Sequence, residues 1–80
     1  MIGRATIEFA LPEVAGTRLS IFDIRGRRVR TLLDGLQTAG AHQVAWDGLD
    51  ERGAAVAAGT YVCQLGTHRG SRTAKIVVLR

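Results

Sequence analysis

Three acidic side chains that lie close together form the first candidate for chemistry in this sequence. Asp47, Asp50 and Glu51 fall within one short stretch, and clustered carboxylates are ligands that calcium prefers. A calcium loop of the EF-hand type needs five or six oxygen ligands at alternating positions and a distal bidentate Glu. That spacing is absent here, and Arg52 interrupts the cluster. We therefore interpret these carboxylates as turn-capping acceptors and predict no metal site.

A dense group of basic side chains is the second candidate, and it consists of Arg25, Arg27, Arg28 and Arg30. If this segment is a hairpin, Arg28 and Arg30 share its outward face. Nucleic-acid sites usually interleave aromatic rings with such charges, and only Phe22 lies near these. We interpret the group as a solvated strand edge whose charges discourage aggregation. The alternative is a polyanion site for nucleic acid or an acidic polysaccharide.

The remaining nucleophiles and metal-ligand types are scattered along the chain. His42 and His68 have no cysteine or acidic partner at the spacing of a zinc site. Cys63 alternates with Tyr61 and Leu65, which predicts a small buried hydrophobe and not a nucleophile. No Ser-His-Asp or paired-acid spacing is present, and no glycine-rich phosphate loop precedes a helix. We expect no catalytic residue, no cofactor and no enzymatic activity.

Length and composition are those of one small folded domain. The 80 residues are 46% hydrophobic and 22% charged, so we predict a single domain over residues 1–80. No apolar run approaches the roughly 20 residues that a membrane helix needs. The net charge of +4 comes from ten arginines and one lysine against seven acids, a balance that favours no single class of partner. One cysteine excludes an internal disulfide, and no leader peptide is recognisable.

Apolar residues alternate with polar ones through most of the chain, which predicts β-strands. The inward positions include Leu19 and Ile21 in the second predicted strand and Ala74, Ile76 and Val78 in the last. A helix is hard to place, because the best candidate, 28–36, is short and lacks a clear N-cap. Short strands with regular turns favour an all-β antiparallel sandwich. The predicted strands cover 5–11, 17–24, 27–33, 42–47, 60–65 and 73–79, with a loop over 34–40.

The stretch 45–61 organises this sandwich. It begins at the only tryptophan, Trp46, and ends at the only tyrosine, Tyr61, and both have the bulk to anchor a thin core. Aspartate and glycine pairs at β-turn spacing mark the corners. The residues that we expect to define the fold are Asp23, Gly26, Trp46, Asp47, Gly48, Asp50, Gly53, Gly59 and Tyr61.

Several motifs in a fixed order resemble a known family. They are Val14 through Gly26 followed by Val29, the run Gly40-x-His42-x-Val44-x-Trp46-Asp47-Gly48, the pair Gly59-x-Tyr61, and the ending Lys75 to Arg80. This set is similar to the Ig-like domain named after the flagellar hook-capping protein. The C-terminal sorting domains of the type-nine secretion system share the pattern. The resemblance covers residues 6–80.

The resemblance implies an Ig-like sandwich of about seven strands. Such a domain is usually the last one of a large exported bacterial protein, and it is non-catalytic. It serves in secretion sorting, surface attachment or protein assembly, so the expected partners are the parent chain, the secretion or assembly machinery, or other copies through strand edges. The expected location is extracytoplasmic. Met1 departs from the family, which rarely stands alone, so we expect a domain of a longer protein.

Overall fold

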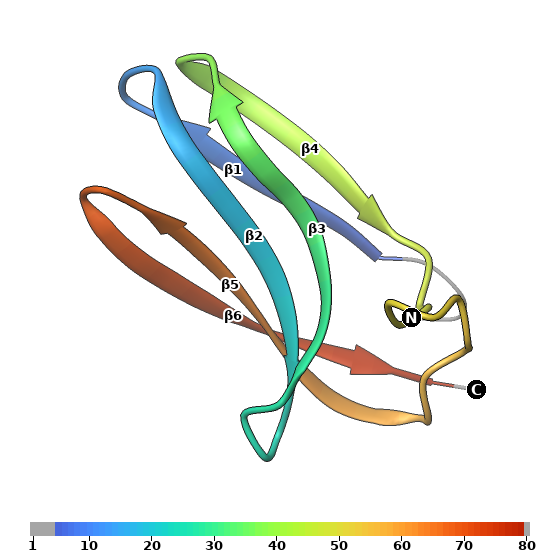
Figure 1. Cartoon of the computed structure of the whole chain (residues 1–80). Helices are drawn as coiled ribbons and strands as arrows, with labels where there is room; N and C mark the ends of the chain where they lie inside the picture. Colours follow the sequence, from blue (N-terminus) through green and yellow to red (C-terminus); the bar gives the residue numbers. More distant parts are fainter. Residues whose placement is uncertain (1–4, 80) are drawn as a thin grey trace.

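The chain forms two antiparallel β-sheets in a computed structural model that describes residues 5–79 (Figure 1). The described part contains no helix, and nothing in it could cross a membrane as one. The predicted all-β sandwich is therefore confirmed, with six strands where about seven were expected. These strands are β1 (Ala5–Leu11), β2 (Ala15–Asp23), β3 (Arg28–Gln37), β4 (Gly40–Trp46), β5 (Gly59–Thr67) and β6 (Gly70–Val78).

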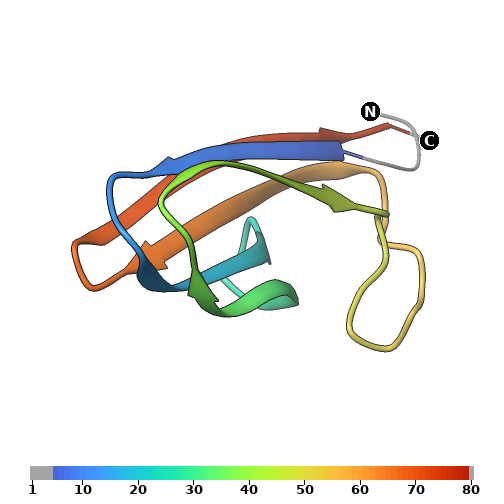
Figure 2. The same cartoon turned by 90° about the horizontal axis from the view of Figure 1, so that it is seen from above.

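The two sheets differ in size. One contains only β1 and β4, and the other has the order β3-β2-β5-β6. Figure 2 shows β1 and β4 above β2 and β3, with β6 of the larger sheet at the height of β1 in this view. The connection from β3 to β4 therefore crosses from one sheet to the other, and so does the longer loop from β4 to β5. A two-stranded sheet is marginal by itself in water, so the smaller layer depends on packing against the larger one.

The core lies between the layers and is built from alternate strand positions. Leu19 and Ile21 on β2, Trp46 on β4 and Val78 on β6 have no exposed surface. They are inward positions of the predicted period-two pattern, so the sequence assigned the core faces of these strands correctly. Tyr61 is also buried, and its ring meets that of Trp46. Both aromatic anchors thus point into the core, as predicted.

One predicted loop is wrong. The Asp34-Gly35 signal suggested a loop over 34–40, but β3 continues to Gln37 and pairs with Ala15 of β2. Hydrogen bonding along β2 outweighs the local turn preference. The register shifts between Leu19 and Ser20, a bulge that leaves one extra residue on β3. The extra residue is Leu32. The side chains of Leu32 and Leu33 are both partly buried and pack on the core, whereas only one of them was expected inside.

Two burial predictions also fail. Ser20 was expected to face solvent, yet only 3% of it is exposed, because Arg18, Phe22 and Gln64 surround it on the outer sheet surface. Ala74 was expected inside but is exposed. It lies on the inner side of β6, where no other strand of residues 5–79 pairs with this edge. That opening leads to the candidate site described below.

Candidate functional site

Carboxylates in the turns accept hydrogen bonds from nearby backbone amides. Oδ1 of Asp50 accepts hydrogen bonds from the amides of Arg52 (2.9 Å) and Ala54 (3.0 Å). Asp23 makes the same pair of bonds to Arg25 and Arg27, at 2.9 and 3.0 Å. Each turn is closed by a glycine in the left-handed region, with φ of 80° at Gly53 and 82° at Gly26. The turn-capping role predicted for Asp50 is confirmed. The same role predicted for Glu51 is wrong, because its carboxylate bonds to β3.

The other two carboxylates join this loop to β3. Asp47 accepts a hydrogen bond from the Leu49 amide (3.1 Å) and forms an ion pair with Arg30 at 2.8 Å. Oε1 of Glu51 accepts a hydrogen bond from the amide of Thr31 at 2.6 Å. Within residues 5–79, no group of three or more His, Cys, Asp or Glu side chains is placed to hold a metal ion. The acidic cluster therefore stabilises the loop in place.

The four arginines of the predicted basic hairpin do not form one surface. Arg25, Arg27 and Arg28 are exposed around the β2–β3 turn. Arg30 is partly buried, and its guanidinium contacts Asp47 and the carbonyl of Leu49 (3.4 Å). Its charge is therefore compensated within the fold. Three of the four arginines therefore remain for an anionic partner.

The histidines and the cysteine lie apart from one another. His42 stacks on Phe9, with ring centroids 5.0 Å apart, and its Nε2 lies 2.8 Å from the carbonyl of Thr38. His68 is exposed near Glu13. Cys63 is buried, as predicted, and burial raises the pKa of its thiol. A thiol with a raised pKa is a poor nucleophile at neutral pH.

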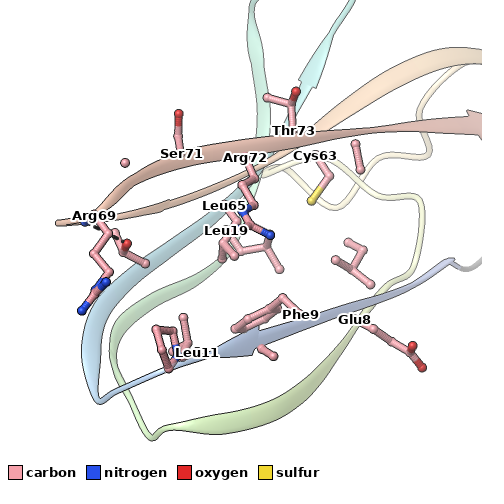
Figure 3. Close-up of a pocket in the computed structure, with 16 residues that line it drawn as sticks. Glu8, Phe9, Leu11, Leu19, Cys63, Leu65, Arg69, Ser71, Arg72 and Thr73 are labelled. Carbon is pink, nitrogen blue, oxygen red and sulfur yellow. Dashed lines mark hydrogen bonds between the residues drawn. The ribbon is translucent and has the colours of Figure 1, made fainter.

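A hollow in the surface opens between β1 and β6, and sequence reasoning did not identify it. Figure 3 shows Phe9 and Leu11 of β1 facing Leu65 and Cys63 of β5 across this space. Its volume is about 540 Å³, within the range of binding pockets. We call it the β1–β6 groove, lined by Phe9, Leu11, Leu19, Cys63, Leu65 and residues 69–74.

One charged side chain reaches into the β1–β6 groove. Arg72 is on the inner side of β6, opposite Leu65 in the register, and it lines the same space as Leu65 and Leu19 (Figure 3). Arg69, at the rim, is held by Glu13 at 2.7 Å. The side chain of Arg72 has no hydrogen bond or ion pair with any residue from 5 to 79. The only sequence signal for it was a cation at an inward position of a strand.

Comparison with known proteins gives the family. The model of the family described as FlgD Ig-like domain matches residues 3–71. The chain belongs to this family. The resemblance derived from the ordered motifs is thereby confirmed, and so is the Ig-like character of the sandwich. No curated protein matches the chain significantly.

Solved structures of two FlgD proteins are similar to this FlgD Ig-like domain. FlgD from P. aeruginosa is 27% identical with a TM-score of 0.73, and the match covers 90% of this chain and 57% of that one. FlgD from Xanthomonas campestris, described as a hook-capping protein essential for flagellar assembly, is 28% identical with a TM-score of 0.71. That match covers 94% of this chain and 55% of the other. The chain thus spans just over half the length of the FlgD proteins that it matches.

Proposed function

We propose that this FlgD Ig-like domain is a non-catalytic module of a larger exported bacterial protein, acting outside the cytoplasm through contacts with other proteins. Its family membership, together with its match to just over half of two FlgD chains, carries this proposal. One of those proteins is described as acting in hook capping during flagellar assembly. Secretion sorting, surface attachment and protein assembly are the roles that such a module can serve. Its extent, residues 1–80, remains a prediction.

The side chains support a role in binding rather than in a reaction. The carboxylates of the β4–β5 loop, those of Asp47, Asp50 and Glu51, accept hydrogen bonds from the loop and from β3. The thiol of Cys63 is buried and has a raised pKa. Strand edges, by contrast, can receive further strands from a partner by backbone hydrogen bonding. An assembly module needs such edges and no reactive group.

An in-frame deletion tests this proposal in the organism that encodes the chain. The codons for residues 5–79 are removed, and the location and assembly of the encoded protein are followed by cell fractionation and immunoblotting. We expect the truncated protein to be made but to fail to reach or to stay in its extracytoplasmic assembly. Unchanged location and unchanged assembly would contradict the proposal. Asp34→Ala in the full-length protein is the control, because its exposed carboxylate contributes little to stability.

Polyanion binding is the second candidate function. The exposed cations Arg25, Arg27 and Arg28 favour it, because none has an ion pair within residues 5–79. If it is correct, Arg28→Glu elutes from heparin at clearly lower salt than the matched variant Lys75→Glu. Equal elution of the two variants removes this candidate. Arg30 is unsuitable for this test, since its replacement also breaks the pair with Asp47.

A further inference from the structure

We propose that the β1–β6 groove binds an extended acidic segment of a partner protein, which adds to the strand edges while Arg72 pairs with its carboxylate. The inference rests on the proposed function, because it specifies which kind of segment the partner protein of such a module would present. Four observations carry it. They are the open strand edges, the apolar lining, the uncompensated charge of Arg72 and the net charge of the chain.

Backbone edges are the first observation. β1 pairs only with β4, and β6 pairs only with β5, among the strands of the described residues. The groove is lined by consecutive residues of both strands, 7–11 of β1 and 70–74 of β6. Because side chains of a strand alternate between faces, an unbroken run means that the strand edge itself borders the space. A third strand beside β1 would also enlarge a sheet that is marginal with two.

The apolar lining is the second observation. Phe9 and Leu11 from one sheet and Leu65 and Cys63 from the other face the same space. A volume of about 540 Å³ accommodates several side chains. A strand placed there directs every second residue into the groove. The segment should therefore carry apolar side chains at alternate positions, since their burial supplies most of the binding free energy.

Arg72 gives the charge of the segment. Its side chain lines the groove, is exposed to solvent and has no carboxylate partner from residues 5–79. The acids near the groove are already engaged: Glu13 with Arg69 at 2.7 Å, and Glu8 with Gln43 at 2.9 Å. If an apolar segment covered Arg72, the charge would be buried without a partner, which is costly in binding free energy. A carboxylate on the segment removes that cost and makes a charge-assisted hydrogen bond.

A second copy of this chain is a poorer occupant. The chain carries a net charge of +4, so two copies repel each other, and symmetric pairing of two β6 edges would bring cations together. An inward-pointing charge on an edge strand can also serve only to block unwanted strand pairing. The two roles of Arg72 differ in outcome. A blocking residue excludes every strand, whereas an anchoring residue selects an acidic one.

The test uses the ¹⁵N-labelled 80-residue chain and two end-blocked synthetic peptides. The first is Thr-Val-Thr-Asp-Thr-Val-Thr, and the second has Lys in place of Asp. We expect the Asp peptide to cause saturable amide shifts in β1 and in residues 69–74, and the Lys peptide to bind at least tenfold more weakly. Arg72→Glu should reverse this preference. Arg25→Glu makes the same charge change at the β2–β3 turn and should alter binding less than twofold.

The inference is overturned if the Asp peptide does not bind saturably, if both peptides bind equally, or if Arg72→Glu leaves the preference unchanged. Should Arg72→Glu not fold, Arg72→Gln replaces it, with an expected loss of at least fivefold for the Asp peptide. If Arg72→Val self-associates and the parent chain binds no peptide, the role of Arg72 is to block unwanted strand pairing. The deletion of residues 5–79 could displace the full-length protein while the Asp peptide fails to bind. That combination would support the assembly role and contradict only the proposal that the groove binds an acidic segment.

Discussion

The indole ring of Trp46 meets the phenol ring of Tyr61 edge to face, with centroids 5.6 Å apart and planes at 70°. Trp46 ends β4 and Tyr61 lies near the start of β5, so the pair joins the two-stranded sheet to the four-stranded one. Each ring is also tied to the loop between them. Trp46 Nε1 donates to the Leu49 carbonyl at 3.0 Å, and the Tyr61 hydroxyl donates to the Ala57 carbonyl at 2.6 Å.

Removing the Tyr61 hydroxyl should separate the stability contributed by its hydrogen bond from that contributed by the packing of its ring. We expect Tyr61→Phe to lower the free energy of unfolding by about 1 kcal/mol, since one part-buried hydrogen bond is lost. Tyr61→Leu also removes the edge-to-face contact and should cost about 3 kcal/mol. Urea denaturation followed by Trp46 fluorescence measures both. Equal stability of Tyr61→Phe and the parent chain would show that the bond contributes nothing.

The two capped turns should be equivalent in stability. Asp23→Ala and Asp50→Ala each remove two carboxylate–amide hydrogen bonds, so we expect a loss of about 2 kcal/mol in each case. Asp34→Ala is the control. Its carboxylate makes only an exposed pair with Arg18 at 3.3 Å, and the expected loss is below about 0.5 kcal/mol. Chemical denaturation of the three variants decides the matter, and a control as unstable as the turn variants would contradict the assignment.

The glycines of these turns provide an independent measurement. A methyl group added at Gly26 or Gly53 meets nothing within 4 Å, so any cost comes from backbone conformation alone. Both have φ near +80°, and alanine there should cost about 1 kcal/mol. Gly16→Ala is the control, because its surroundings are equally open and its φ is not in the left-handed region. Thermal unfolding at fixed pH compares the three. A Gly16→Ala variant as unstable as the other two would rule out a conformational cause.

The pair Arg30–Asp47 should behave as structure and not as binding surface. Its side chains are 31% and 42% exposed, so solvent weakens the attraction, and we expect a coupling of about 0.5 to 1 kcal/mol. A double-mutant cycle with Arg30→Gln and Asp47→Asn measures it. Arg28→Gln, two residues away and unpaired, should leave stability unchanged. A coupling of zero would show that Asp47 does not engage Arg30, which would then be available to an anionic partner like the exposed Arg25, Arg27 and Arg28.

Acid pH should loosen the rim of the β1–β6 groove. The hydrogen bond and the charge of Arg69 hold the pKa of the Glu13 carboxyl below its ordinary value, with a smaller contribution from His68. A carboxyl with a lowered folded-state pKa stabilises the fold above its unfolded pKa of about 4.3. That contribution is lost as pH falls through the lower, folded value. An NMR titration of Glu13 measures this, and Arg69→Gln should raise the pKa while Arg52→Gln should not.

Much of the sandwich could be predicted because its signals are local. Ile7, Phe9 and Leu11 alternate along β1, and period-two alternation identifies a core face without knowledge of the partner strand. The turns at Asp23 and Asp50 are equally local, because the carboxylate bonds amides only two and four residues ahead. The ordered motifs then gave the family, although they gave no reaction and no partner.

The sequence by itself determined most of the strand segments, the core faces of most strands and where two aspartates cap the turns, since these depend on neighbouring residues. Only the tertiary structure decided the bulge beside Ser20, the pairing of Arg30 with Asp47 and the exposure of Ala74 and Arg72. These depend on the register between distant strands and on which sheet edges lie uncovered. A residue on an inner face is buried only if another element covers it, and period-two alternation carries no information about that element.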